Sequence, residues 1–213
     1  MNCCMQDAFN LGWKLALVLK GYAKPELLDT YEAERRPYAH RVIQMAIAVG
    51  SLMTGGTART CRLRRAALRA VTRFPGAEEK AFNAVWPAFA PGPLTARQSR
   101  AAGRPCPQPR IRTGTDEVLL DRALGNGFAV LARGHDAGEA FDPATRRFFD
   151  ALGTTVVRLD AVTDVDGGLT ALLDEAGADA LLLRPDRVVA DTADRVDLRR
   201  WRRLLESAGI TAP

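Results

Sequence analysis

Cysteine and histidine side chains are the first groups in this sequence to consider for catalysis or metal binding. The chain of 213 residues contains four cysteines and two histidines, at Cys3, Cys4, Cys61, Cys106, His40 and His135. No cysteine pair has the Cys-x-x-Cys spacing, and no cluster supplies the ligands that a zinc ion needs. We therefore expect no metal site. Cysteine is also too sparse for a disulfide scaffold, which indicates a reducing compartment.

Some of these side chains have neighbours that invite a chemical role. Cys3 and Cys4 stand at the start of a predicted helix, where the helix dipole lowers a thiol pKa. No partner base is visible, so packing as small residues is the favoured interpretation. His135 and Asp136 lie in a glycine-rich stretch without a nucleophile, which predicts a surface loop. His40 lies on a predicted helix, where we expect a packing or solvent role; the sequence thus offers no catalytic residue.

The glycines of Gly125-Asn126-Gly127 invite comparison with a nucleotide-binding turn. A dinucleotide cradle follows a strand and contains a third glycine, whereas this segment precedes a predicted strand and lacks that glycine. We therefore predict a turn into the strand. The sequence contains neither a P-loop nor a Gly-x-Ser-x-Gly motif.

The beginning of the chain is predicted to be a helix. Residues 5–20 carry a wide apolar stripe with Phe9, Trp13 and Leu17 at four-residue spacing. A stripe of this width is typical of a buried helix. Gly21 is well placed to end the helix.

Further helices are predicted behind it. Pro25 fits the first turn of a second helix, and Pro37 should end or kink that helix before a third helical stretch runs to about Met53. Two shorter helices are expected over residues 59–73 and 77–90. Proline, glycine and arginine then dominate residues 90–110, which predicts an extended linker and the best domain boundary in the chain.

The hydrophobic period changes after the linker. Short apolar and β-branched runs predict strands over residues 128–132, 154–159, 180–183 and 187–190, and helices over 143–152, 169–175 and 198–205. The first two strands should be parallel because a helix connects them, and Arg184-Pro185-Asp186 should turn the last two into an antiparallel hairpin. The order β-α-β-α-β-β-α is that of a thioredoxin-like domain. No cysteine follows Cys106, so the dithiol pair of that fold is absent.

Two segments of the first half resemble a known family. MNCCMQDAFNLGWKLALVLKG (1–21) and LLDTYEAERRPYAHRVI (27–43) are similar to the C-terminal part of the FAD module of class A flavoprotein aromatic hydroxylases. More loosely, GRPCPQPRI, LLDRALGNGFAVLARG and DALLLRPDRVVA resemble the C-terminal thioredoxin-like extension of phenol hydroxylases and 3-(3-hydroxyphenyl)propionate hydroxylases. The resemblance covers most of the chain and is weakest at about residues 55–100.

The resemblance implies an α/β chain with three modules. Residues 1–55 are the C-terminal helices of an FAD-binding module, 56–110 a helical connector and linker, and 111–213 a thioredoxin-like domain lacking Cys-x-x-Cys. It implies FAD as the cofactor, NAD(P)H as the co-substrate and an aromatic or phenolic substrate that is hydroxylated with O2.

The resemblance also implies where the flavin lies. In the family, backbone N–H groups of a Met-Asn step and of the following helix point at the pyrimidine side of the flavin. A helix N-terminus there favours the negative charge of the reduced ring. The matching positions are Met1, Asn2 and Cys3, which would act mainly through the backbone.

Four more positions match the family and are expected to act structurally. The resemblance implies that Asp7 and Asn10 fix the helix by hydrogen bonds, and that Arg35 and Arg36 tie it to the rest of the module. The glycine-rich, Asp-Gly and Gly-Asp motifs that hold the rest of FAD have no counterpart here. We therefore expect Met1 to interrupt a longer protein and the isolated chain to be inactive.

Other functions stay open at this stage. One is a stand-alone thioredoxin-like interaction module without redox activity, whose apolar helices pack on a second copy or on a separate FAD-binding subunit. The net charge of +5 and the arginines of residues 59–73 and 199–203 raise nucleic-acid binding, but no binding motif accompanies them, and a solvated face is favoured. The longest apolar run, residues 45–53, is too short to cross a membrane. With no signal peptide visible, we expect a cytoplasmic location.

Overall fold

The computed structural model describes residues 2–54, 88–89, 92–134 and 142–212, with separate positions between 56 and 73. The chain divides into two compact units, Met1–Glu34 with Phe89–Pro213, and Arg35–Ala88. The helices expected over 59–73 and 77–90 lie largely outside the described residues. The loop expected at His135 and Asp136 lies outside them as well.

The first helix, α1 (Asn2–Leu19), ends as its sequence predicts. Gly21 has a φ of 72°, a left-handed conformation that suits glycine. Its N–H donates to the Val18 carbonyl at 3.0 Å, and the Tyr22 N–H donates to the Leu17 carbonyl at 2.9 Å. This pair of bonds is a Schellman motif, which satisfies the last carbonyls of the helix.

The next helical segment differs from its prediction. A short 3₁₀ turn, η1 (Pro25–Leu28), leads directly into the long helix α2 (Asp29–Met53). Pro37 lies inside α2 and does not end it, so of the two outcomes expected at Pro37 the end of the helix is wrong, and a kink stays a prediction. A proline in a helix removes one backbone hydrogen bond, and here the turns on both sides continue the helix.

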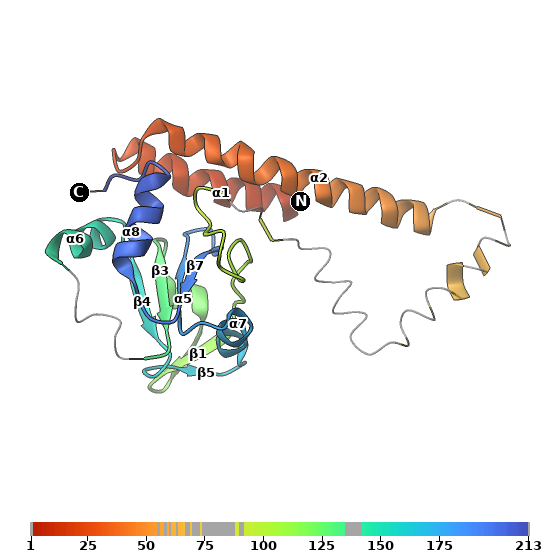
Figure 1. Ribbon diagram of the computed structural model, residues 1–213. Coiled ribbons are helices and arrows are strands. Elements are labelled where there is room, and N and C mark those ends of the chain that lie inside the picture. The colour runs from red at the N-terminus through yellow and green to blue at the C-terminus, as the bar shows by residue number, and fades with distance from the viewer. Residues whose placement is uncertain are drawn as a thin grey trace. The chain divides into compact units, whose positions relative to one another are not determined.

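A four-stranded sheet forms the centre of the first unit (Figure 1). Its strands are β3 (Ala129–Ala132), β4 (Thr155–Arg158), β6 (Ala180–Leu183) and β7 (Val189–Ala193), in the order β4-β3-β6-β7. Strand β3 pairs with β4 in parallel, whereas β6 is antiparallel to both β3 and β7. The predicted parallel pair and the predicted terminal hairpin are thus both confirmed.

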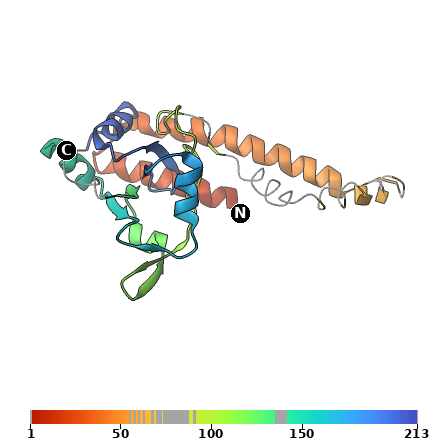
Figure 2. The same ribbon diagram turned by 60° about the horizontal axis from the view of Figure 1, so that its bottom comes forward.

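Helices cover both faces of this sheet (Figures 1 and 2). On one face, α6 (Pro143–Ala151) and α8 (Leu198–Ser207) pack against the side chains of Val130 and Leu182. On the other face, α5 (Leu120–Leu124) and α7 (Gly168–Ala176) pack against the intervening residues Leu131 and Leu181. Alternate residues of each strand therefore serve opposite faces.

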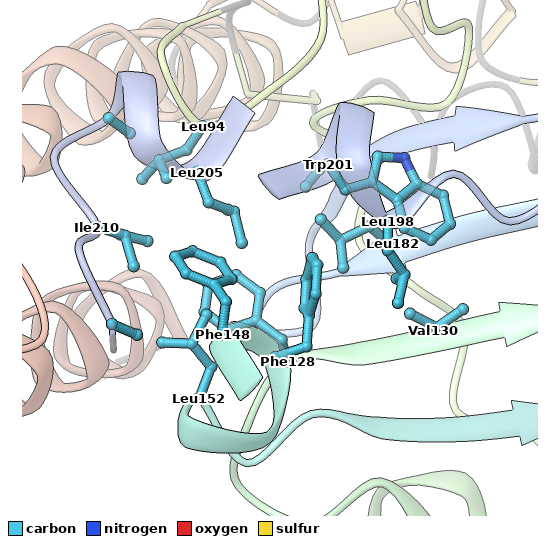
Figure 3. Packing of buried hydrophobic residues seen from close by; sticks show 14 of the residues in the cluster. Leu94, Phe128, Val130, Phe148, Leu152, Leu182, Leu198, Trp201, Leu205 and Ile210 are labelled. Carbon is cyan, nitrogen blue, oxygen red and sulfur yellow. The ribbon is translucent and has the colours of Figure 1, made fainter. Parts of the chain in front are cut away.

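Large apolar side chains fill the layer under α6 and α8 (Figure 3). Trp201 of α8 is fully buried, and Phe128 and Phe148 have only 1% of their surface exposed. Asp142 caps α6 by accepting a hydrogen bond from the Thr145 N–H at 2.9 Å. The hydrogen bonds from Thr145 lower the pKa of Asp142 to about 2.

A second, smaller sheet was not expected. Its strands are β1 (Arg110–Thr113), β2 (Asp116–Leu119) and β5 (Thr163–Asp164), in the order β2-β1-β5. Arg110 joins them through ion pairs with Glu117 at 2.9 Å and Asp166 at 2.7 Å. The strands are short and mostly exposed, so they lack the apolar alternation that identifies a strand in a sequence.

The segment expected to be an extended linker is packed against the larger sheet. Leu94 and Ala101 are fully buried. The Ala96 N–H donates to the Ala190 carbonyl, and the Gly103 N–H donates to the Val189 carbonyl, both at 2.8 Å. Residues 92–110 are thus part of the first unit, because backbone groups there pair with β7. The compact units also differ from the modules 1–55, 56–110 and 111–213, which stay a prediction about family organisation.

Gly127 is a position at which a side chain should be poorly tolerated. A Cβ atom there would lie 2.1 Å from the Gly153 carbonyl oxygen, whereas a Cβ at Gly12 of α1 meets nothing within 4 Å. We expect Gly127→Ala to lower the free energy of unfolding by about 2 kcal/mol, because backbone must move. Gly12→Ala should raise it by about 0.5–1 kcal/mol through helix propensity. Urea unfolding of both variants checks the contrast, and equal effects would contradict it.

Candidate functional site

The predicted flavin-facing residues stand at the start of α1. Met1 lies outside the described residues, and Asn2 is the first residue of α1. Cys3 follows within the helix and is half-buried. The first amides of a helix have no partner within it, and they carry the positive end of the helix dipole. No acidic side chain lies in the first turn of α1, so this end is suited to a negatively charged group.

One face of α1 is apolar and exposed. Met5, Phe9, Leu15 and Leu19 have 53%, 64%, 38% and 84% of their surfaces exposed. The expectation that the Phe9 stripe is buried is therefore wrong at Phe9. Trp13 does pack inward, with its ring centroid 5.6 Å from that of Phe128 in an edge-on arrangement. The helix therefore has apolar side chains on two sides, one packed on the core and one exposed.

Polar side chains share the buried side of α1 with Trp13 and Leu17. Asn10 and Lys14, one turn apart, are both fully buried. Lys14 Nζ donates to Asn10 Oδ1 at 2.9 Å and to Glu34 Oε2 at 3.0 Å. Asn10 Nδ2 donates to Glu34 Oε2 at 2.8 Å and to Asp186 Oδ2 at 3.0 Å. The expected hydrogen-bonding role of Asn10 is confirmed, and its partners come from α2 and from the turn between β6 and β7.

Arg184 lies at the centre of this group and is fully buried. Its Nη1 and Nη2 atoms donate to the two Glu34 carboxylate oxygens at 2.7 and 2.9 Å. Its Nε and Nη2 atoms donate to the two Asp186 oxygens at 3.0 and 2.6 Å. The guanidinium also lies 5.5 Å from the Trp13 ring centroid and 5.7 Å from that of Phe89. We call Asn10, Lys14, Glu34, Arg184 and Asp186 the buried polar cluster.

The cluster contains two cations and two anions, and burial together with the neighbouring charges shifts the pKa values of Lys14, Glu34 and Arg184. Burial raises the pKa of Glu34, but the Arg184 and Lys14 charges outweigh it and lower that pKa to about 2. Burial lowers the pKa of Lys14 to about 8, with Arg184 acting in the same direction and Glu34 opposing it. The two carboxylates raise the pKa of Arg184 against the effect of its burial. Glu34 and Arg184 are therefore charged at neutral pH.

A cavity of about 930 Å³ lies between α1 and the turns at one end of the sheet. Phe9, Trp13 and Phe128 contribute aromatic walls, while Asn126 and Arg187 contribute polar groups. The Gly125-Asn126-Gly127 segment thus forms a turn before β3, as predicted, and lines this cavity.

Two further candidates from the sequence, Cys106 and His40, lie within the described residues. Burial raises the pKa of the Cys106 thiol to about 12, so this residue stays a neutral thiol. His40 is exposed on α2. Within the described residues, no group of three or more histidine, cysteine or acidic side chains is arranged to hold a metal ion. No helix in the same part of the chain is long and apolar enough to cross a membrane.

Most of the buried polar cluster was missed at the level of sequence. Lys14 stands among apolar residues of a helix, and the pattern Arg184-Pro185-Asp186 by itself predicts only a turn. A charged side chain at a core-facing position and an Arg-x-Asp pair after a buried strand are signals that such residues pair with each other. Their partner Glu34 is 150 residues away from Arg184, and sequence spacing alone does not reveal that contact.

Two families of known protein domains match different parts of this chain. The FAD binding domain family matches residues 1–46, and the HcaD C-terminal domain family matches residues 103–208. A 3-(3-hydroxy-phenyl)propionate/3-hydroxycinnamic acid hydroxylase from Mycolicibacterium smegmatis is 34% identical over 225 residues, which cover 91% of this chain and 39% of that protein. The hydroxylase of the same name from Escherichia coli strain SMS-3-5 is 31% identical, with 90% and 39% covered.

Solved structures that are similar to this chain include further hydroxylases and monooxygenases. The OxyS anhydrotetracycline hydroxylase from Streptomyces rimosus has a TM-score of 0.64 and 29% identity over 90% of this chain and 37% of its own. The flavin-dependent monooxygenase PieE, solved with FAD and substrate, has a TM-score of 0.62 and 25% identity over 97% and 43%.

This chain is similar to FAD-dependent aromatic hydroxylases. It spans about two fifths of the length of these hydroxylases and aligns with their C-terminal part. Helix α1 lies within the residues that match the FAD binding domain family, and the four-stranded sheet lies within the residues that match the HcaD C-terminal domain family. The buried polar cluster connects the two matched regions.

Proposed function

We propose that the chain is the C-terminal part of an FAD-dependent monooxygenase that hydroxylates a phenolic or other aromatic small molecule with NAD(P)H and O2. The observation that carries this proposal is the FAD binding domain match over residues 1–46, which contains α1. The names of the matched relatives support an aromatic substrate. Since the chain spans only about two fifths of those relatives, we propose that it is inactive in isolation.

We further propose that the start of α1 lies at the pyrimidine edge of the flavin, with backbone groups of Met1, Asn2 and Cys3 closest to it. Bound flavin would accept hydride from NAD(P)H and activate O2. The contribution of this chain is electrostatic, because an 18-residue helix with no acid in its first turn favours negative charge at its N-terminus. The residues present therefore fit one edge of a flavin site.

We propose that residues 111–213 form a thioredoxin-like domain without redox chemistry. The strand order β4-β3-β6-β7, with one parallel pair and a terminal hairpin, supports this assignment. No cysteine follows Cys106 in the sequence, so a dithiol on the sheet-covering helices is ruled out by residue type.

We propose that the exposed apolar face of α1 packs against the rest of the flavin module. The face belongs to a helix within the FAD-binding match, and its large side chains lack cover here. Packing on a second copy or on a separate FAD-binding subunit stays a prediction, as does a cytoplasmic location.

Nucleic-acid binding receives no support from the second arginine group. In α8, Arg199, Arg200 and Arg202 pair with Asp142, Asp191 and Glu206. Ion pairs of this kind neutralise the face that a nucleic acid would need. A small aromatic molecule is the substrate that we propose.

The function can be tested in a chimera in which this chain replaces the C-terminal 39% of the M. smegmatis hydroxylase. We expect the chimera to oxidise NADH or NADPH in the presence of 3-(3-hydroxyphenyl)propionate and to form a hydroxylated product. The isolated chain is the negative control. A folded chimera that binds the flavin but forms no product from any phenolic acid tested would contradict the proposal.

The exposed face of α1 gives a separate prediction. Leu19 is 84% exposed, so Leu19→Gln should change the free energy of unfolding of the isolated chain by less than about 0.5 kcal/mol. In the chimera, the same substitution should destabilise the protein by about 1–3 kcal/mol, because it places a polar group in a packed interface. Chemical unfolding of both proteins measures this.

The matched control is Leu119→Gln, since Leu119 is 46% exposed on β2. It should have a small effect in both proteins. Equal effects of Leu19→Gln in the chain and the chimera would show that the α1 face has no partner in the flavin module.

A further inference from the structure

We propose that Arg184 and Asp186 are positioning residues for α1, the helix that we propose faces the flavin, so that the four-stranded sheet determines where the start of α1 lies. This inference rests on the proposed function for its flavin. The hydrogen bonds that join Arg184 and Asp186 to Glu34 and Asn10, which we call the clamp, are a property of this chain. The two residues form the turn between β6 and β7, and they reach Glu34 and Asn10, which are 150 and 176 residues away.

The geometry of Arg184 leaves it little freedom. Its guanidinium makes two hydrogen bonds to Glu34 and two to Asp186 in forked arrangements. Forked bonds fix the plane of the guanidinium, and a lysine cannot reproduce them. The Trp13 ring of α1 lies over the same group. Arg184 is therefore a rigid point on the sheet against which α1 and the start of α2 are placed.

Asn10 connects α1 to both carboxylates at the same time. Its amide nitrogen donates to Glu34 at 2.8 Å and to Asp186 at 3.0 Å. Lys14, one turn further on, bonds to the Asn10 side chain and to Glu34. A rotation of α1, or a slide by one turn of about 5.4 Å, would break the bonds that Asn10 and Lys14 make to Glu34 and Asp186. The cluster thus defines both the rotation and the axial position of the helix.

The position of Asn10 also fixes the position of the start of α1, which is the end that we propose faces the flavin. Cys3 lies seven residues before Asn10 on the same continuous helix, a distance of about 10 Å at 1.5 Å per residue. A buried ion-pair cluster is a poor source of stability compared with apolar packing. Its value here lies in orientation, because only one placement of α1 satisfies every charge.

The chain offers a closely matched control on its own surface. Arg158 and Asp160 are also two residues apart, with Nε–Oδ1 and Nη2–Oδ2 distances of 3.0 and 2.7 Å, compared with 3.0 and 2.6 Å for Arg184 and Asp186. The Arg158 side chain is 37% exposed, whereas that of Arg184 is fully buried. The same substitutions at the two pairs therefore separate the clamp from an ordinary arginine–aspartate fork.

Amide hydrogen exchange of the 213-residue chain tests the clamp without any flavin. We expect Arg184→Lys and the milder Asp186→Asn to speed exchange in residues 6–18 of α1 by about tenfold or more, while β3 and β6 keep their protection. Arg158→Lys and Asp160→Asn should leave α1 unchanged. Unchanged α1 exchange in Asp186→Asn, or an equal increase in α1 and in both strands, would overturn the proposal.

A second measurement connects the clamp to the flavin. In the chimera, Arg184→Lys should weaken FAD binding by about tenfold, whereas Arg158→Lys should not. Equal FAD affinities of the Arg184→Lys and parent chimeras would overturn the link to the flavin. If the parent chimera bound no FAD, the proposed function would fail, while the exchange result on the isolated chain would still decide the clamp.

Discussion

Replacing Glu34 with alanine is expected to lower the free energy of unfolding by about 3–5 kcal/mol. Glu34 is 2% exposed and accepts hydrogen bonds from Arg184, Lys14 and Asn10. Its removal leaves two cations in a buried site with Asp186 as the remaining anion. An uncompensated buried charge is far more destabilising than the loss of an exposed ion pair.

Glu206 provides the control for this substitution. It pairs with Arg202 one turn away on α8 at 2.7 Å, and its side chain is 41% exposed. We expect Glu206→Ala to change the free energy of unfolding by less than about 0.5 kcal/mol. Urea unfolding of both variants measures the difference. Similar small effects for the two would show that the buried polar cluster is not a stabilising unit.

The second large effect concerns pH. The pKa of Glu34 falls from 4.5 to about 2 on folding, so its stabilising contribution is complete above pH 4.5 and is lost as the pH falls from 4.5 to about 2. A shift of this size corresponds to about 3 kcal/mol in the free energy of unfolding. Glu34→Gln should remove most of this acid dependence.

Lys14 gives the opposite limb of the pH profile. Its pKa falls from 10.5 to about 8 on folding, so the unfolded chain binds more protons between these values. The free energy of unfolding should therefore rise as the pH increases from 8 to 10.5. Lys14→Met should abolish this rise. Urea unfolding across the pH range tests both limbs, and a profile identical in the parent chain and both variants would contradict the assignments.

The C-terminal fold could be predicted because its signals are local. Four successive apolar residues in Ala180–Leu183 identify a strand that is buried on both faces. Leu198, Trp201 and Leu205 recur at helical spacing, and all are buried in α8. The proline and aspartate around residue 185 identify the connecting turn.

The exceptions arise where distant contacts outweigh local pattern. Residues 92–110 have the composition of a linker, yet backbone pairing with β7 orders them. Such outcomes depend on tertiary partners that no short window of sequence contains.

The candidate site was predictable only in part. The family resemblance led to the start of α1 and to a role for Asn10, which the structure places in a buried hydrogen-bond network. The apolar stripe predicts the inward packing of Trp13 and Leu17, which contact the core, but it also predicts a buried Phe9, which is 64% exposed. The deciding charges, Glu34 and Arg184, belong to segments 150 residues apart.

The FAD content of the chimera is the measurement that tests the central claim most directly. The account predicts about one FAD per chain after desalting when this chain completes the M. smegmatis hydroxylase, and none for this chain alone. A chimera that folds, as judged by cooperative unfolding, yet retains no FAD would show that α1 does not complete a flavin site.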